Sequence, residues 1–274
     1  TMEGKPGGEF IKKVIDDGGY QLDPNFVAIF SGDNDSSPEI IFPLIADAVN
    51  SQSYGNTTYI VNGSLSADTM TLSDYGAAEG WGGHRSTKAW YGLFGDLDTS
   101  TDDRAKLFWT EGHNYEMTDY KEWTDGYPSI KFRNSNFNSP SSPTSFSGTD
   151  FPLFRLADAY LIYAECAVRG AAGTDMGTAT QYVNDVRTRS HASTISQSAL
   201  TLDFMIDERG RELNFEGQRR TDLIRFGKFT GGSYLWPWKG NSLDGTSIPD
   251  TYRLFPIPLT ALEANSNLQQ NPGY

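Results

Sequence analysis

The sequence predicts a mainly α-helical protein with long irregular loops and a few short strands. Three observations lead to this prediction. Apolar residues with helical spacing are concentrated in the second half of the chain. The first half is rich in serine, asparagine, threonine, glycine and aromatic residues, and it has little helical periodicity. Two successive helical segments, joined by a short turn, together have about the 34 residues of a tetratricopeptide-like unit.

Only short elements are expected in the first 150 residues. The first is an amphipathic stretch that ends at a glycine pair, and the second is an apolar run between two prolines, which is typical of a strand. In chain order, the expected elements are the amphipathic stretch 9–17, the strand 38–43, loops over 50–85, one or two helical turns in 86–94, a short element with an acidic N-cap at Asp102, and a long polar connection over 134–150.

Helices dominate the rest of the chain. We expect them over 154–169, 178–189, 202–216 and 219–228, with a last short helix starting at Pro258. One tetratricopeptide-like pair cannot bury its apolar face alone, so the helical half looks incomplete. The expected regions are a loop-rich ligand-facing part (1–150), a tetratricopeptide-like part (151–230), and a C-terminal loop and tail that pack on the helices (231–274).

The net charge of the chain limits which kinds of ligand or partner it can bind. With 35 acidic and 22 basic side chains, the net charge is −13. Binding to nucleic acid or to an anionic membrane surface requires an excess of Lys and Arg, so both are disfavoured, whereas a neutral ligand is compatible. The single cysteine, Cys166, lies in a helical apolar run and is expected to be a core residue without a disulfide.

The densest charge lies in residues 208–225. Glu208, Glu212 and Glu216 repeat every four residues and therefore share one helix face, where they repel unless they are compensated. The nearby arginines, together with Arg155 and Asp158 from an earlier helix, are the expected partners. We therefore interpret this segment as a partly buried structural network rather than a catalytic carboxylate pair. The arginines in question are Arg209, Arg211, Arg219, Arg220 and Arg225.

No metal or cofactor is expected. The three histidines lack metal-ligand spacing. The segment 96–102 alternates oxygen-bearing residues like a calcium loop, but it lacks that loop's glycine at the sixth position. A glycoside hydrolase needs two acids that flank a sugar, and no spacing in the sequence singles out such a pair.

Aromatic residues cluster in the loop-rich half beside polar side chains. Flat rings can stack on the apolar face of a sugar while amides and charged groups bond its hydroxyls. The candidate ligand-binding residues are Trp81, Tyr75, Tyr54, Tyr59, Asn56, Arg85 and Trp90.

Several motifs resemble those of the SusD/RagB family. The end of the chain carries Arg-Leu-Phe-Pro-Ile-Pro at 253–258 and Asn-Pro-Gly-Tyr at 271–274. Arg-Leu-Ala-Asp at 155–158 and Asn-Asp-Val-Arg at 184–187 resemble two helix motifs of the family. The resemblance covers nearly the whole chain.

The resemblance implies an outer-membrane lipoprotein of Bacteroidetes, on the extracellular face. It would bind oligosaccharides without catalysis and deliver them to a SusC-like TonB-dependent transporter. The N-terminal half, with the lipid-anchored cysteine, is expected to be missing from this chain and to be a partner of it. The alternatives that stay open are a glycoside hydrolase, a protein-interaction scaffold and a peptide-binding nutrient receptor. The family's binding residues vary with the ligand, so the candidate site rests on the aromatic cluster alone.

Overall fold

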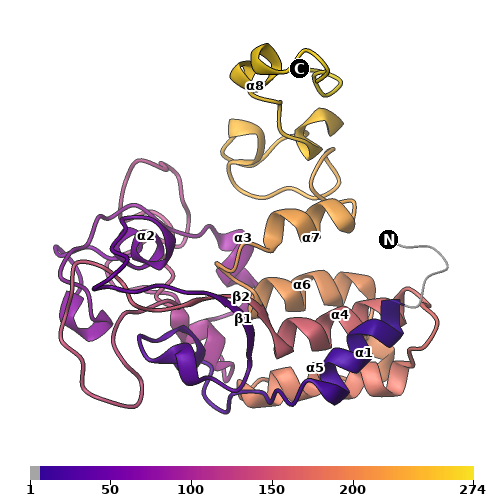
Figure 1. The fold of residues 1–274 in the computed structure, drawn as a ribbon, viewed down its shortest axis with the longest axis horizontal. Coiled ribbons are helices and arrows are strands. Elements are labelled where there is room, and N and C mark those ends of the chain that lie inside the picture. Colours follow the sequence, from indigo (N-terminus) through magenta and orange to yellow (C-terminus); the bar gives the residue numbers. More distant parts are fainter. Residues whose placement is uncertain (1–6) are drawn as a thin grey trace. The chain divides into compact units, whose positions relative to one another are not determined.

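The computed structural model describes residues 7–274. The chain forms two compact units, one that extends to Arg219 and one from Arg220 to Tyr274. Figure 1 shows helices joined by long connections, with one small sheet. The predicted fold class, mainly helical with long loops and few strands, is confirmed. The three regions expected from the sequence remain a prediction about how the chain is used.

Four helices form the helical layer of the first unit: α1 (Gly7–Asp17), α4 (Leu156–Val168), α5 (Met176–Arg189) and α6 (Leu202–Glu212). Helix α4 packs against the other three, and Figure 1 shows them side by side. Small and branched residues on α4 and α5 are buried where the two helices meet, which allows a close approach. Tyr160 of α4 stacks on Tyr182 of α5, with ring centroids 4.3 Å apart.

The ends of these helices follow from local chemistry. Asp175 accepts a hydrogen bond from the backbone N–H of Thr178, and Thr201 accepts one from Phe204, so both act as N-caps. The predicted cap at Asp102 is confirmed, because its carboxylate accepts from the backbone N–H of Arg104. Helix α6 ends at Glu212 rather than at residue 216. Its C-cap, Leu213, has left the helical conformation, with a φ of −101° and a ψ of 24°, and Phe215, with a φ of 60°, lies in the turn that follows.

A two-stranded antiparallel sheet joins distant parts of the first unit. Strand β1 (Ile40–Leu44) is the predicted apolar run, and it pairs with β2 (Phe151–Arg155). The sequence predicts a helix from residue 154, so β2 corrects that expectation. The correction has a tertiary cause: the backbone of residues 151–155 pairs with β1, and Arg155 stays extended and places its side chain in the buried interior.

The loop-rich part has its own hydrophobic core, in which Phe30 lies 5.0 Å from Phe132 and packs with Val61 and Leu65. Helices α2 (Asn56–Gly63) and α3 (Lys88–Tyr91) lie in this part. Helix α3 agrees with the expected helical turns, whereas α2 falls where only loop is predicted. Its β-branched and polar residues have weak helix propensity, and burial of one face stabilises it instead.

All but the first residue of helix α7 (Arg219–Arg225) belongs to the second unit, and α8 (Leu259–Ala264) lies near its C-terminus. Pro258 precedes α8 as its N-cap and is not its first residue. The guanidinium of Arg220 lies 4.9 Å from the ring of Phe229 and 4.4 Å from that of Phe255, so the arginine joins the two aromatic residues. Over residues 7–274, no helix combines the length and the apolar character needed to cross a membrane.

Candidate functional site

Three exposed aromatic rings lie together on the surface of the loop-rich part. The ring centroid of Trp81 is 6.2 Å from that of Tyr54 and 6.3 Å from that of Tyr59. Tyr54, Tyr59 and Trp81 are 60%, 55% and 39% exposed. We call these three residues the aromatic platform. Tilted, accessible rings at this spacing can stack on the apolar faces of neighbouring rings in a ligand.

The end of helix α2 holds Trp81 in place. The last carbonyl groups of a helix have no partner within it. Here the carbonyl oxygen of Asn62 accepts from the N–H of Trp81 at 2.8 Å, and that of Gly63 accepts from the N–H groups of Gly83 and His84. The helix that carries Tyr59 thus fixes the backbone that carries Trp81. The indole N–H of Trp81 donates to the carboxylate of Glu79 at 3.2 Å, which orients the ring.

A second segment completes the platform from far along the chain. Hydroxyl groups on α2 bond the backbone of residues 147–149: Thr57 donates to the carbonyl oxygen of Thr149, and Thr58 accepts from the N–H of Ser147. These bonds bring Phe146 to a centroid distance of 4.9 Å from Tyr54. The sequence prediction missed Phe146, because it lies in a polar connection rich in serine and proline. Its only sequence signal is that it is an isolated aromatic residue in that loop.

Aromatic packing continues from the platform towards Trp90. The imidazole of His84 meets the ring of Tyr59 edge-on, and Phe215 lies 6.5 Å from His84 and 6.0 Å from Trp90. The indole N–H of Trp90 donates to the carbonyl oxygen of Gly210 on helix α6 at 2.7 Å. Trp90 therefore joins α3 to α6, and no direct ring contact links it to the platform among the described residues.

Tyr75 was expected from the sequence to bind the ligand, and the structure corrects this expectation. Its side chain is buried in the hydrophobic core of the loop-rich part, where the guanidinium of Arg133 lies 5.7 Å from the ring. Burial raises the pKa of its hydroxyl above the ordinary value. A ring that the core covers cannot offer its face to a ligand, so Tyr75 contributes to folding and not to the platform.

Arg85 and Asn56 lie close to platform residues in the sequence, but the structure uses them to hold the fold together. The guanidinium of Arg85 donates four hydrogen bonds to backbone carbonyl oxygens and lies 5.6 Å from the ring of Trp123. Four such bonds fasten the loops together and leave little capacity for a ligand. Asn56 opens helix α2 with a φ of 52°, a left-handed conformation that asparagine tolerates better than most residues.

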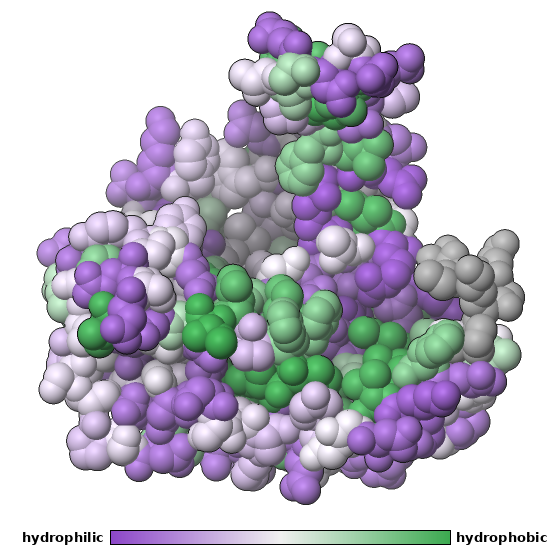
Figure 2. Space-filling model, in the orientation of Figure 1, coloured by the Kyte–Doolittle hydropathy of each residue, from purple (hydrophilic) through white to green (hydrophobic). Residues whose placement is uncertain are grey.

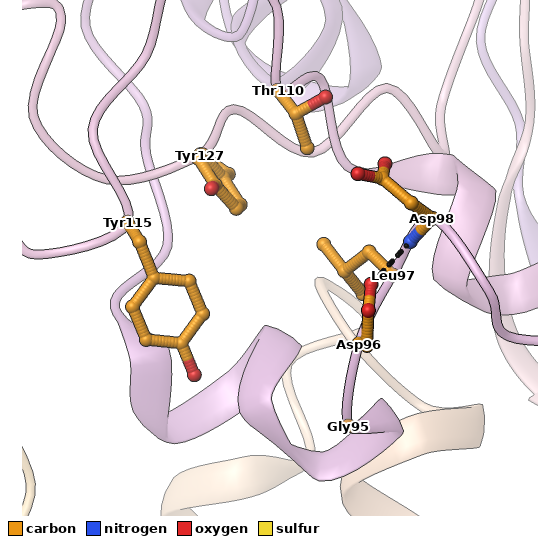
Figure 3. A pocket seen from close by; sticks show the side chains of 7 residues that line it. All are labelled: Gly95, Asp96, Leu97, Asp98, Thr110, Tyr115 and Tyr127. Atoms are coloured by element: carbon orange, nitrogen blue, oxygen red, sulfur yellow. Dashed lines mark hydrogen bonds between the residues drawn. The ribbon is translucent and has the colours of Figure 1, made fainter.

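A separate cavity of about 470 Å³ lies beside a turn at residues 95–98. In Figure 3, the rings of Tyr115 and Tyr127 lie across the cavity from Asp96 and Asp98. Asp96 accepts from the backbone N–H of Asp98 at 3.0 Å, which closes the turn. Burial raises the pKa of Tyr127, as do the neighbouring Tyr115 and Asp98. This cavity is a second place where hydroxyl-bearing ligands could be held, and it is the natural comparison for the platform.

Behind these surfaces lies a buried ion network. Arg155 pairs with Glu39, Glu212 and Glu216 at 2.6–2.8 Å, and its side chain is 1% exposed. Arg104 pairs with Glu208 and Glu212 at 2.8–2.9 Å, and it is equally buried. The structural interpretation of the acidic repeat is therefore confirmed. The remaining members of the network are Asp102, Lys131, Arg187, Arg189 and Arg211.

The partners within this network agree only in part with the sequence expectation. Arg155 pairs with Glu212 and Glu216 as expected, and Asp158 joins through Arg209 at 2.8 Å. Arg211 pairs with Glu208, but most of the other cations come from elsewhere in the chain. Arg219 donates to the carbonyl oxygen of Ile206, and Arg225 pairs with Asp222. Distance along the chain is a poor guide because helices α4, α5 and α6 bring their charged faces together only when they pack.

Burial and the charges within the network shift the pKa values of some of its members. Burial alone would raise the pKa of Glu208, but the guanidinium groups of Arg104, Arg211 and Arg187 lower it to about 2. Burial lowers the pKa of Lys131 to about 8, although Glu216 acts in the opposite direction. Glu208 is therefore ionised at neutral pH and paired with Arg104, Arg187 and Arg211, so it cannot act as the general acid of a hydrolase.

Metal binding has no candidate centre in the described part of the chain. Over residues 7–274, no group of three or more His, Cys, Asp or Glu side chains is arranged to hold a metal ion. The imidazole Nδ1–H of His113 donates to the carbonyl oxygen of Gly126, and the ring lies edge-on to Trp123. The chemistry that remains at the surface is aromatic stacking with nearby hydrogen-bonding groups.

Comparison with known proteins places this arrangement in context. The SusD family matches residues 105–274. The starch-binding protein SusD of Bacteroides thetaiotaomicron is 32% identical to this chain, over 97% of this chain and 55% of the length of SusD. SusD-like protein P25 of Formosa agariphila is 34% identical, over 51% of this chain and 28% of the length of P25. The solved structure of surface glycan-binding protein A from Bacteroides thetaiotaomicron, in complex with laminarihexaose, superposes with a TM-score of 0.72 at 26% identity. It covers 96% of this chain, which in turn covers 58% of that structure. The chain thus spans little more than half the length of the first of these relatives.

Proposed function

Because the chain belongs to the SusD family, we propose that its aromatic platform binds oligosaccharides at the cell surface and does not cleave them. The observation that carries this proposal is the geometry of Tyr54, Tyr59 and Trp81. The ring centroids of Tyr54 and Tyr59 lie 6.2 and 6.3 Å from that of Trp81, and these three accessible rings offer stacking surfaces to successive sugar rings.

The ligand that fits best is a neutral glucan oligosaccharide. The net charge of −13 disfavours anionic polymers, and the carboxylate of Glu79, which accepts from the indole of Trp81, adds a negative charge beside the platform. One similar protein is named for starch binding, and another was solved with laminarihexaose. Both are glucans, which makes glucose oligomers the first class to test.

Non-catalytic binding is favoured over hydrolysis. Hydrolysis needs two carboxyl groups about 5–10 Å apart on either side of a sugar. The acids that recur on helix α6 are buried and paired with arginine, and similar proteins are named as binding proteins. As a finer step, we propose that the bound oligosaccharide passes to a SusC-like TonB-dependent transporter, and that the protein is lipid-anchored on the outer membrane.

Isothermal titration of the full chain against a panel of soluble α- and β-glucan oligosaccharides tests this function. We expect binding by the unmodified chain and at least a tenfold loss in Trp81→Ala, which corresponds to about 1.4 kcal/mol. Tyr115→Ala, in the separate cavity, is the matched control and should leave the affinity unchanged. Affinity that survives Trp81→Ala but is lost in Tyr115→Ala would move the site to the cavity.

Two further measurements separate the rival functions. Incubation of the chain with the same oligosaccharides should give no new reducing ends, whereas shorter products would support a hydrolase. Titration with short peptides should give no heat. A peptide that binds with an affinity sensitive to Trp81→Ala would make the platform part of a peptide receptor.

A further inference from the structure

Large apolar side chains stay exposed on the small sheet and on the loop that follows β1. Ile45 is 73% exposed, and Phe42 and Phe154 are both more than half exposed. Figure 2 shows hydrophobic residues gathered over the region of β1 and β2. We call this set the apolar face; its members are Phe42, Leu44, Ile45, Val49, Leu153 and Phe154.

The strand register creates this face. Phe42 and Phe154 are directly opposite one another, and their ring centroids are 6.4 Å apart. On β2, Arg155 and Pro152 are buried, so the sheet has a protein-facing side and an outward side. A sheet of only two strands is marginally stable in water unless a face is packed. Contiguous exposed apolar groups of this kind mark surfaces that another structure covers.

The composition of the face indicates a permanent interface. Residues 40–49 and 151–154, which carry the face, contain a single charged side chain, that of Asp47. Transient interfaces are about as polar as the rest of a protein surface, whereas obligate ones resemble a hydrophobic core that has been cut in half. A loosely associating partner is therefore a poor fit for this face.

The lengths of the relatives identify the occupant. The chain covers 55% of the starch-binding relative and 58% of the glycan-binding structure, so the SusD fold includes a large portion to which this chain has no match. We propose that the apolar face binds that unmatched portion of the SusD fold, in the same polypeptide or in another. The face then becomes part of a continuous core.

This docking also bears on the platform, a step that rests on the proposed function. The loop between the apolar face and helix α2 leads from Ile45 to Tyr54. The backbone N–H of Ala46 donates to the carboxylate of Asp150 at 2.8 Å, which ties the start of this loop to the residue before β2. Covering Ile45 and Val49 would restrict the rest of the loop, and therefore the position of the Tyr54 ring. Oligosaccharide affinity should be higher when the face is covered.

Thiol labelling tests the docking without any glycan. The protein to use is a chimera in which this chain replaces the matched part of the starch-binding relative, with the single cysteine removed by Cys166→Ala. Leu44→Cys then introduces one thiol in the apolar face, and Lys106→Cys introduces one at an exposed position elsewhere. We expect a maleimide to react at least tenfold more slowly at position 44 in the chimera than in the isolated chain, and equally fast at position 106 in both.

Equal labelling at position 44 in the chimera and in the isolated chain would overturn the proposal. So would labelling of the isolated chain that slows with protein concentration while sedimentation shows a dimer, because a second copy would then occupy the face. Failure of glycan binding would leave both labelling results unchanged.

A second measurement covers the case of a chimera that does not fold. In the isolated chain, Phe42→Ser with Phe154→Ser should at least halve the fluorescence of an apolar dye such as 8-anilinonaphthalene-1-sulfonate, with no shift of the urea midpoint. The matched pair Tyr115→Ser with Tyr120→Ser, exposed elsewhere, should leave the dye signal unchanged. A large fall in the urea midpoint of the Phe42 and Phe154 pair would instead assign these residues to the chain's own core and would overturn the proposal.

Discussion

The imidazole of His84 lies edge-on to the ring of Tyr59, with the two centroids 4.5 Å apart. Next to this pair, a Cβ atom on Gly63 would come within 2.4 Å of the imidazole. Glycine at position 63 therefore lets the backbone of residues 81–84 approach the end of helix α2 closely enough for its hydrogen bonds to form. The surface platform thus depends on a close contact beneath it.

Substitution of this glycine should weaken ligand binding. In Gly63→Ala, the added methyl group would displace His84 and, through it, Tyr59. We expect at least a tenfold loss of affinity for the best oligosaccharide of the panel by isothermal titration, with the far-ultraviolet circular dichroism retained. Gly232→Ala is the control, because its Cβ would meet only ordinary contacts with Ser247. Equal affinities in the two variants would show that the close contact at Gly63 does not govern the platform.

Phe146 should support the platform without being its main contact. Its ring lies 4.9 Å from Tyr54, and its own exposure is intermediate. Phe146→Ala should therefore reduce affinity by a few fold, less than Trp81→Ala, because it frees Tyr54 to move. Isothermal titration of both variants against the same oligosaccharide measures which of them loses more affinity. A larger loss in Phe146→Ala than in Trp81→Ala would contradict it.

Binding should be nearly independent of salt. The proposed ligand is neutral and the contacts are stacking and hydrogen bonds, which ionic screening barely affects. Between 50 mM and 500 mM sodium chloride, we expect the dissociation constant to change by less than about twofold. A tenfold weakening over this range would indicate a charged ligand or charged contacts outside the platform.

Loss of one acid in the buried ion network should destabilise the fold strongly. Glu212 accepts hydrogen bonds from Arg104, Arg155 and Arg189, and Glu212→Gln would leave a buried positive charge uncompensated. The expected loss is about 3–5 kcal/mol in the free energy of unfolding, measured by urea denaturation. The exposed pair of Lys88 and Glu116 provides the control, and Glu116→Gln should cost less than about 1 kcal/mol.

The same network predicts how stability depends on acid. The pKa of Glu208 is about 2 in the folded protein, below the ordinary value of 4.5 that applies to the unfolded chain, so folding favours the ionised form. Its stabilisation is complete above about pH 4.5 and is lost as the pH falls towards 2. Urea unfolding at several pH values should show a smaller decrease over this window in Glu208→Gln than in the unmodified chain. Parallel curves for the two proteins would show that Glu208 titrates alike in both states.

Local patterns in the sequence were sufficient for the helical layer. The apolar spacing predicted α4 and α5, and the carboxylate of Asp102 predicted a cap, because these features depend on neighbours within a few residues. Strand β2 and helix α2 were not predictable in the same way. The first needs β1 as a partner, and the second is stabilised by burial rather than by propensity.

The candidate site, too, was predictable from the sequence only in part. The sequence by itself determined that aromatic and polar residues gather in the loop-rich half, and that the acidic repeat on helix α6 needs cations. Only the tertiary structure decided which rings are usable: it exposes Tyr54, Tyr59 and Trp81, buries Tyr75, and uses Arg85 to bond backbone carbonyl oxygens. The physical reason is that exposure and partner choice depend on contacts between segments far apart in the chain. The hydrogen bonds from the backbone of residues 81–84 to the carbonyl groups at the end of helix α2 are the contacts that assemble the platform.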